Sequence, residues 1–456
     1  MRKLISKLFP FNNEILKETL SIAWPAIVET LFMALAGLLD SLMVSKLGSE
    51  YVAAVGLTTQ PKMIGLALFF AMSVATSAVV ARRNGEKRRD SANETLLTSF
   101  IFVLISGAII SVLFVVFADP IIRFCRSSDK THGPAVEYFR IIMGGILFNC
   151  IQIVINSAQR GAGNTKITMY TNVTSNTINV IFNYLLIGGH LGFPELGIKG
   201  AAIATVLGTV VSCIMSIISV CKKDRFLSIQ YIIKEKIRPT WDAFKVLVKF
   251  GYSVCIEQVL LRVGFMATAM MAADLGDDPL AAHQVAMHIL TVSFAFGDGL
   301  QHAAVALIGR SLGEKDVKKA KTYGAACQTV GFIISILVAI AFLLGGRWIM
   351  SIFFQKDPHI VDIGVKLVYV MIVVVLFQII QVIYTGALRG AGDTLYTAIS
   401  STISVTVVRT AISFVFAYTF GLGITGVWIG ILADQVMRFI LSSIRFKRGK
   451  WVKIKI

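Results

Sequence analysis

The sequence has few charged residues. Only 15% of its 456 residues are Asp, Glu, Lys or Arg, whereas 55% are hydrophobic and the mean hydropathy is +0.74. Because about a quarter of the residues in soluble domains are charged, these values argue against a soluble protein. The six cysteines are scattered and form no CxxC pair, which argues against a disulfide framework or a zinc site. Neither a resident cofactor nor a metal ion is expected.

Long polar segments are also scarce. Apolar stretches follow one another from about Leu20 to Ile444 with short polar breaks between them. Each is close to the roughly 20 residues that cross a ~30 Å hydrocarbon layer, and we count about twelve. The first stretch has no small-residue cleavage site behind it, so we expect it to remain as the first span. The predicted fold class is an all-α integral membrane protein.

The net charge of +18 reflects membrane topology more than nucleic-acid binding. With both termini in the cytoplasm, most of the 44 lysines and arginines fall on the cytoplasmic side, including Arg160 and Arg389 in two short loops. This asymmetry follows the positive-inside rule, and it indicates contact with anionic membrane lipids. We therefore expect a multi-pass protein of the cell membrane, a monomer, with both termini cytoplasmic and no nucleic-acid partner.

The second half of the chain repeats the first. Leu47 and Gly48 match Leu275 and Gly276, one GEK segment matches another, and RGAGNT matches RGAGDT, all at offsets of 228 or 229 residues. Six spans in each half give both halves the same orientation, which is a parallel repeat. We expect an N-lobe (1–221), a cytoplasmic linker (222–244), a C-lobe (245–444) and a basic cytoplasmic tail (445–456). The repeat favours a transporter, although channels and membrane enzymes can also be duplicated.

Ionisable residues inside spans are costly and indicate function by default. Glu29 and Asp40 are eleven residues apart, close to three helical turns, so they share one face of the first span. A functional role is favoured for Asp40, whereas Glu29 is equally compatible with function and with structure. Asp298 is either a cavity acid or part of a helix break. The eight such residues are Glu29, Asp40, Glu257, Arg262, Asp298, Arg409, Asp434 and Arg438.

Amide side chains, joined by one threonine, form stripes on three predicted spans. Pro25 permits a kink in the first span. Amides can hold helices together, but three stripes favour a hydrated substrate cavity, centred in the N-terminal half. The stripes are Asn149, Gln152, Asn156 and Gln159; Asn172, Asn176, Asn179 and Asn183; and Gln378, Gln381 and Thr385.

Two groups of charged residues in the C-terminal half are expected to form ion pairs or to bind a ligand. Asp434 and Arg438 have the i,i+4 spacing of a helix ion pair, and Arg409 can share this structural network. Glu257 and Arg262 are five residues apart and point in different directions, so Glu257 needs another partner. A second cation or substrate site at Glu257 is an open alternative.

Taken in order, these features resemble the multidrug and toxic compound extrusion (MATE) family of transporters. The resemblance covers essentially the whole chain, and the pattern is similar to the DNA-damage-inducible F-type branch. It implies two six-helix lobes around a V-shaped cavity and export driven by inward flow of H⁺ or Na⁺. The segments that carry it are Pro25 to Gly48, the loops RRNGEKRRD and GRSLGEKD, the RGAGNT and RGAGDT turns, and GVWIGILADQVMRF.

The resemblance also implies residue roles. Asp40 falls where family members carry an acid used for cation coupling, Pro25 falls at the bending proline, and Asn179 falls at a polar position of the fifth span. Asn183 departs from the pattern, because many prokaryotic members have a second aspartate there. Glu257 matches an acidic position of the seventh span. The expected ion site is therefore Asp40 with Asn179 and Asn183.

The resulting hypothesis is secondary active efflux of small organic, often cationic, molecules by antiport with H⁺ or Na⁺. The sequence shows no catalytic constellation, so an enzyme is not expected. The strongest alternative is a lipid-linked oligosaccharide flippase of the same superfamily. Such a protein needs a cationic cavity, for which Arg262 and Arg409 are the candidates.

Overall fold

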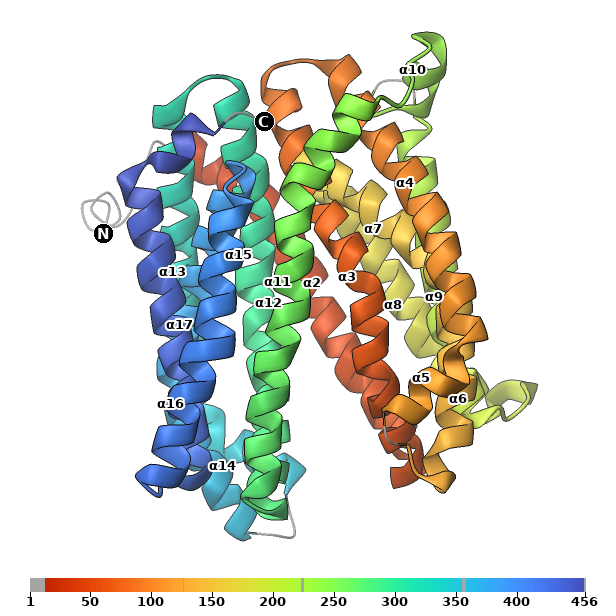
Figure 1. Cartoon of the computed structure of the whole chain (residues 1–456), viewed down its shortest axis with the longest axis vertical. Coiled ribbons are helices and arrows are strands. Elements are labelled where there is room, and N and C mark those ends of the chain that lie inside the picture. Colours follow the sequence, from red (N-terminus) through yellow and green to blue (C-terminus); the bar gives the residue numbers. More distant parts are fainter. Residues whose placement is uncertain (1–12, 126, 223–224, 355–357, 455–456) are drawn as a thin grey trace. The chain divides into compact units, whose positions relative to one another are not determined.

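The computed structural model describes residues 13–125, 127–222, 225–354 and 358–454, and all regular structure in these ranges is helical (Figure 1). The α-helices are α2 (Asn13–Ser45), α3 (Ser49–Gly85), α4 (Arg89–Val116), α5 (Ala118–Phe124), α6 (Asp129–Gly144), α7 (Ile146–Gly161), α8 (Thr165–Ile187), α9 (Gly197–Val220), α10 (Ile229–Lys234), α11 (Trp241–Asp274), α12 (Asp277–Gly313), α13 (Val317–Phe353), α14 (Pro358–Gly390), α15 (Thr394–Thr402), α16 (Thr410–Phe414) and α17 (Gly423–Arg448). Two short 3₁₀ segments are η1 (His190–Gly192) and η4 (Lys450–Lys453), and two π-helical segments are η2 (Ile403–Arg409) and η3 (Val415–Thr419).

The helices account for the twelve expected spans. Among the described residues, ten helical stretches are long and apolar enough to cross a membrane, with α15 to η3 counted as one. Helices α6 and α7, bent by 46° at their junction, give an eleventh. Helix α8 has 23 residues, about 35 Å at 1.5 Å per residue, and its asparagines lower its hydropathy. The all-helical membrane fold is confirmed.

The helices pack into two compact units, which we describe separately. The N-terminal unit comprises residues 31–255, and the C-terminal unit comprises residues 13–30 together with 256–454. These limits differ from the expected lobes because two long helices each contribute to both units. Helix α2 belongs to the C-terminal unit up to Thr30, and α11 belongs to it from Ile256 onward.

The internal repeat extends to helix lengths and backbone angles. Helices α3 and α12 both have 37 residues, and turns at corresponding positions of the two halves have matching residues with positive φ angles. Glycine adopts positive φ values without strain, so it suits four of these six positions, whereas Lys87 and Lys315 adopt them with a side chain present. The matched φ values are 128° and 114° at Gly48 and Gly276, 57° and 62° at Lys87 and Lys315, and 86° and 89° at Gly163 and Gly392.

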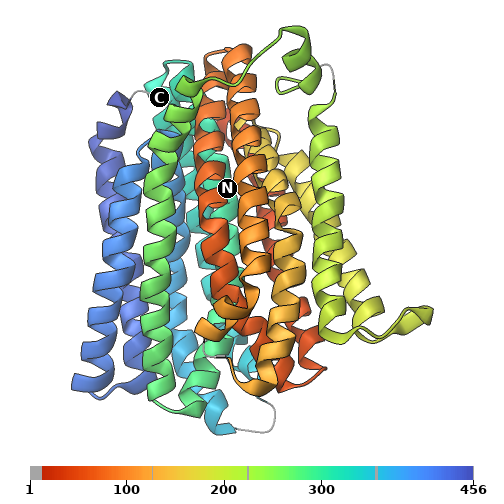
Figure 2. The ribbon, with the colours of Figure 1, turned by 45° about the vertical axis from the view of Figure 1, so that its right-hand side comes forward.

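In the N-terminal unit, α3 packs against α6 and α7, and α8 packs against α9. Figure 2 shows α3 (red-orange) and α9 (yellow-green) running along the long axis of the unit. A buried apolar cluster that includes Val80, Leu96 and Ile155 joins α3, α4 and α7. The RGAGNT segment ends α7 and turns tightly into α8 through Gly163, as expected for a short hairpin.

In the C-terminal unit, α14 packs against α12, α13 and α17. The first half of α2 is fixed to this unit at Glu18, which accepts hydrogen bonds from Arg310 (2.5 Å) and from Tyr323. Leu300 and Trp428 are fully buried in the apolar core. These contacts explain why the start of α2 is grouped with the C-terminal helices.

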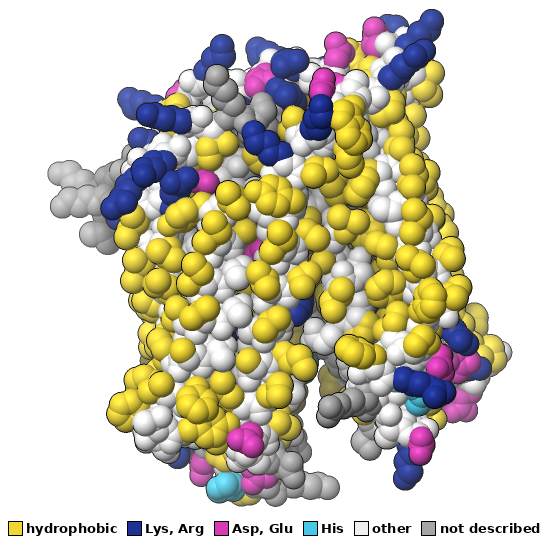
Figure 3. Space-filling model, viewed as in Figure 1, with side chains coloured by type: hydrophobic (Ala, Val, Ile, Leu, Met, Phe, Trp, Pro, Cys, Tyr) yellow, Lys and Arg dark blue, Asp and Glu magenta, His cyan; other side chains and the backbone are white. Residues whose placement is uncertain are grey.

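The linker and the tail are more structured than the sequence indicated. Helix α10 lies within the linker, and α11 begins at Trp241, before the expected boundary. Helix α17 continues through the expected tail to Arg448, and Trp451 is buried and stacked on Phe446 with the ring centroids 5.0 Å apart. In Figure 3, lysines and arginines gather beside α10 and near the C-terminus, and hydrophobic side chains cover much of the visible surface of each unit.

We expect Gly299→Ala to destabilise the C-terminal unit. A Cβ at Gly299 would lie 2.5 Å from the Ile27 Cα atom on α2, so the helices would have to separate. Overpacking of this kind costs about 1 to 3 kcal/mol. Thermal unfolding of the purified protein in detergent should show a lower melting temperature. The matched control is Gly56→Ala, because a Cβ there meets nothing within 4 Å; equal melting temperatures for the two variants would contradict the prediction.

Candidate functional site

Asp40 on α2 lies at a polar cluster of the N-terminal unit. The Asn183 side-chain amide on α8 donates to Asp40 Oδ1 at 2.5 Å and approaches Asn179 Oδ1 at 3.4 Å. Asn179 in turn donates to Thr205 Oγ1 on α9 at 3.1 Å. Asn183 is fully buried, and its Oδ1 atom has no hydrogen-bond partner among the described residues. The structure therefore brings together the three residues expected to form the ion site.

Two further residues lie close enough for a charge on them to affect the Asp40 carboxylate, and neither was predicted from the sequence. They are Lys62 on α3 and Tyr138 on α6. Within the described residues, Asp40 has no ion pair with a nitrogen within 4.0 Å, so Lys62 influences the carboxylate from a greater distance. The signal for Lys62 was a single lysine within the apolar stretch TTQPKMIGLALFF. A lone cation in such a stretch belongs with the other intramembrane charges.

The amides of α7 bond to neighbouring helices. Gln152 donates to Asn172 Oδ1 on α8 at 2.5 Å. Asn156 donates to Thr171 Oγ1 on α8 at 3.0 Å and accepts from the Ser216 hydroxyl on α9 at 2.9 Å. All five side chains are buried. This part of the stripe holds three helices together, which is the structural role that amides can have in membranes.

Asn176 and Asn149, two other amides of the stripes, make no side-chain hydrogen bond to a neighbouring helix within the described residues. Asn176 donates to the backbone carbonyl of Asn172 at 2.8 Å, within its own helix. Asn149 is partly exposed and makes no side-chain hydrogen bond within the described residues. The hydrated cavity expected along these stripes stays a prediction.

Glu29 and Pro25 lie in the first half of α2. Helix α2 is continuous through Pro25. Glu29 is only 2% exposed and belongs to the C-terminal unit, whereas Asp40 belongs to the N-terminal unit. The two acids predicted to share one helix face therefore lie in different units.

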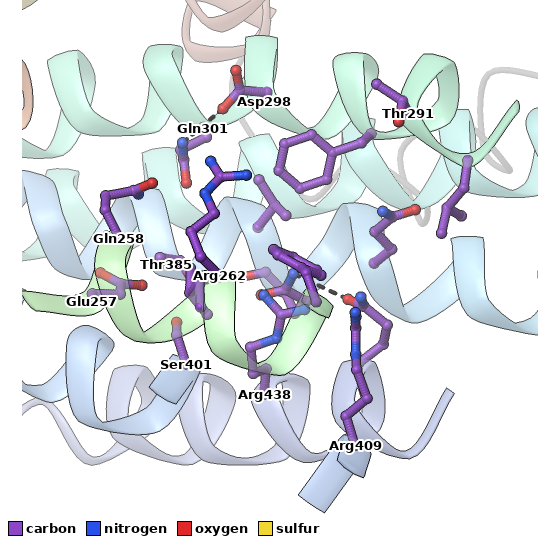
Figure 4. A pocket seen from close by; sticks show the side chains of 18 of the residues that line it. Glu257, Gln258, Arg262, Thr291, Asp298, Gln301, Thr385, Ser401, Arg409 and Arg438 are labelled. Atoms are coloured by element: carbon purple, nitrogen blue, oxygen red, sulfur yellow. Dashed lines mark hydrogen bonds between the residues drawn. The ribbon is translucent and has the colours of Figure 1, made fainter. Parts of the chain in front are cut away.

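The C-terminal unit contains a cavity of about 380 Å³ between α11, α12, α14 and α17 (Figure 4). Glu257, Gln378 and Gln381, which were expected to form part of a substrate cavity, all line it. Its other charged or amide residues are Gln258, Arg262, Asp298, Gln301, Arg389, Arg409, Gln435 and Arg438. The structure thus separates the expected cavity residues into two sets, one in each unit.

The partner of Glu257 is Arg389. The Arg389 Nη2 atom lies 2.7 Å from Glu257 Oε2, and the Glu257 side chain is 2% exposed. Arg389 was expected in a cytoplasmic loop, but it lies in the last turn of α14 and is buried. Because this arginine neutralises Glu257, the carboxylate is not an open cation site in this structure.

Asp434 binds two arginines at the wall of the cavity. Arg409 donates to Asp434 Oδ2 at 2.6 Å, and Arg438 donates to both carboxylate oxygens at 2.8 and 2.9 Å. Asp434 is fully buried and Arg409 is 2% exposed. Asp434 and Arg438 form the ion pair that their i,i+4 spacing predicted, and Arg409 shares this network, as expected. One carboxylate here faces two guanidinium groups, which leaves an excess of positive charge.

Asp298 lines the same cavity. Helix α12 runs without interruption from Asp277 to Gly313, so Asp298 is a cavity acid and not part of a helix break. Gln301 donates to it at 2.8 Å, and the His302 ring nitrogen lies 3.7 Å away. Among the described residues, no group of three or more His, Cys, Asp or Glu side chains could hold a metal ion.

Comparisons with known proteins agree with this architecture. A sequence model of the family described as MatE matches residues 25–185 and 253–415, one match in each half of the repeat. A probable multidrug resistance protein NorM of Thermotoga maritima is 29% identical over 445 residues, covering 96% of this chain and 94% of that protein. The uncharacterized transporter YisQ of Bacillus subtilis is 25% identical over 441 residues, covering 95% and 94%.

A solved structure has the same fold. It is described as the outward-facing conformation of a multidrug resistance MATE family transporter of the MOP superfamily. Its TM-score is 0.88 at 23% identity, and the superposition covers 97% of this chain and 98% of that one.

We expect Asp434→Asn to destabilise the C-terminal unit strongly. The substitution leaves Arg409 and Arg438 without their carboxylate in a buried place, and breaking a buried ion pair in this way costs about 3 to 5 kcal/mol. The measurement is thermal unfolding in detergent. The control is Asp362→Asn, because the Arg347–Asp362 pair has side chains 75% and 61% exposed and such pairs contribute about 0 to 1 kcal/mol. Equal unfolding temperatures for both variants would be inconsistent with the network.

Proposed function

Because the chain belongs to the MatE family of membrane transporters, we propose that it exports small organic, often cationic, molecules by antiport with H⁺ or Na⁺. The observation that carries this proposal is the half-buried carboxylate of Asp40, held by Asn183 without a close ion pair among the described residues. The name of one relative, a probable multidrug resistance protein, supports export of drug-like molecules, and the name of another, an uncharacterized transporter, supports transport alone.

The Asp40 cluster has the chemistry to bind a small cation. A proton binds the carboxylate directly, and Na⁺, like other hard cations, prefers carboxylate and amide oxygens. Three suitable groups are present: the Asp40 carboxylate, the Asn179 Oδ1 atom, and the Asn183 Oδ1 atom, which has no hydrogen-bond partner in the described part. The cluster supplies the ligands for either ion.

The driving force is sufficient for uphill export. One pH unit supplies about 1.4 kcal/mol per proton, and 100 mV supplies about 2.3 kcal/mol per charge. For a neutral substrate exchanged for one proton the two contributions add to about 3.7 kcal/mol, more than a hundredfold gradient. For a monovalent cation exchanged for one proton no net charge moves, so only the pH difference acts and supports about a tenfold gradient. A cation drives a conformational change only if it binds one conformation more tightly than the other. We propose that Asp40 supplies this difference, and that a kink at Pro25 accompanies it.

Lys62 opposes cation binding at Asp40. Its positive charge acts on the same carboxylate, so it competes electrostatically with a bound H⁺ or Na⁺. A competing lysine keeps the affinity for the ion low enough for release. Lys62 therefore tunes the ion concentration at which the transporter changes state.

A lipid-linked oligosaccharide flippase is the second candidate function, and the arginines around the C-terminal cavity are the observation that favours it. Such a substrate carries a pyrophosphate, which guanidinium groups bind well. Reconstituted vesicles separate the two functions, because a flippase moves a labelled lipid between leaflets and an efflux transporter moves a soluble dye.

We also propose the membrane topology and the oligomeric state. The clusters of lysine and arginine beside α10 and near the C-terminus support a cytoplasmic position for these ends under the positive-inside rule. They also support contact with anionic lipids of the cell membrane. The protein acts as a monomer in this proposal.

We expect Asp40→Asn to abolish ion-coupled efflux. The amide cannot take up a proton or carry the negative charge that attracts Na⁺, so an imposed gradient no longer drives transport. Ethidium efflux from proteoliposomes, with pH and Na⁺ gradients imposed separately, measures the loss and identifies the ion. The control is Glu50→Gln, because Glu50 is exposed in the first turn of α3. Wild-type efflux by Asp40→Asn would refute the assignment.

We expect Lys62→Gln to strengthen ion binding. Without the lysine, H⁺ or Na⁺ meets less electrostatic competition at Asp40, so half-maximal efflux occurs at less Na⁺ or at a pH about one unit higher. The pH and Na⁺ dependence of ethidium efflux measures the shift. Lys62→Arg, which keeps the charge, serves as the control. An unchanged ion dependence in Lys62→Gln would show that this charge does not tune the site.

A further inference from the structure

We propose that the cavity of the C-terminal unit is a binding site for organic anions, which it recognises by a carboxylate or phosphate group. The cavity has about 380 Å³, within the range of small-molecule sites. The excess of positive charge around the cavity and the unpaired hydrogen-bond donors of its arginines both favour a negatively charged ligand. Export of the bound anion would rest on the proposed transport function. Binding of the anion to the cavity does not depend on that function.

Positive charge exceeds negative charge around the cavity. Four arginines line it, whereas the acids that line or adjoin it are Glu257, Asp298 and Asp434. Glu257 is neutralised by one of the arginines, and Asp434 is shared by two. The buried ion pairs therefore leave an excess of positive charge around the cavity, and a bound anion would neutralise this excess.

Arg262 is the arginine that a ligand can reach. It projects from α11 into the cavity in Figure 4, below Gln301. It makes no hydrogen bond or ion pair within the described residues, and it is only partly exposed. A guanidinium presents five donors in a flat fork that matches a carboxylate or phosphate. A partly desolvated and unpaired guanidinium binds such a group more strongly than one in water.

Arg409 supplies a second donor. Its Nη2 and Nε atoms bind Asp434, but its buried Nη1 atom has no hydrogen-bond partner among the described residues. The π-helical segment η2 ends at Arg409, and π-helical turns are common at functional sites. An unsatisfied buried donor is costly, so an acceptor from a ligand would relieve that cost.

The rest of the lining suits the body of an organic molecule. Leu261, Phe265, Leu290, Phe294 and Val382 provide apolar surface beside the arginines. Apolar walls with a few placed polar groups are typical of sites for small organic ligands. The ligand class is therefore an amphipathic molecule with an apolar or aromatic body and one anionic group.

The test is equilibrium binding to the purified full-length protein in nanodiscs of phosphatidylcholine. The probes are dansylglycine, which carries a carboxylate, and dansylamide, which has the same fluorophore without charge. We expect wild-type protein to bind dansylglycine more tightly than dansylamide. Arg262→Gln should weaken dansylglycine binding about tenfold or more, the usual loss for a hydrogen bond to a charged group, and leave dansylamide binding unchanged.

Three variants control the result. Arg262→Lys keeps a positive charge and should retain most of the preference for dansylglycine. Lys245→Gln removes an exposed lysine from the same helix and should have no effect. Asp40→Asn should bind dansylglycine like the wild type, so a failure of ion-coupled efflux is distinguishable from a failure of the anion site. Equal binding of the two probes, or an unchanged affinity in Arg262→Gln, would overturn the proposal.

A second arm identifies the source of the anion. Nanodiscs that contain phosphatidylglycerol offer an anionic lipid headgroup in place of a soluble ligand. If this lipid competes with dansylglycine in the wild type, the anion is a lipid headgroup. If dansylglycine binds equally in both kinds of nanodisc, the anion is a soluble organic molecule. Both results support recognition of an anion by Arg262.

Discussion

The cost of a charge inside a membrane is the constraint on which this structure depends. A charged side chain in a span must be paired, be hydrogen-bonded, or reach a polar space. Glu257 with Arg389, and Asp434 with Arg409 and Arg438, meet this requirement by pairing in buried places. These pairs join α11 to α14, and η2 to α17, so they help to fix the helices that form the walls of the C-terminal cavity.

The charges that are not paired in this way mark the candidate sites. Asp40 keeps one amide donor and a distant lysine in the N-terminal unit, and Arg262 extends into the cavity of the C-terminal unit. The cost of leaving such groups without a close ion pair is offset only if a ligand binds them or if water reaches them. Unpaired charge is therefore a better guide to function here than the amides, because most amides of α7 bond to neighbouring helices.

The sequence predicts local features of this protein well and its packing less well. The repeat, the glycine turns and the i,i+4 pair of Asp434 and Arg438 depend on spacing along the chain, which can be counted. The burial of Arg389 could not be predicted, because it lies at the end of a span, where a loop arginine and a buried arginine look alike. The shared helices α2 and α11 were also missed, since no composition change marks Thr30 or Ile256.

The repeat also shows how the same helical backbone can support two sites of different charge. The turns of the two halves match in backbone angle, and Glu29 matches Glu257, but the charged residues of the two candidate sites do not match. At the offset of 228 residues, Asp40 corresponds to Thr268 and Arg262 corresponds to Ala34. Each half thus has a polar site on the helix that begins its repeat, acidic in one and basic in the other. Because turn glycines set the backbone and single side chains set the charge, the two sites can differ without any change in the helical frame.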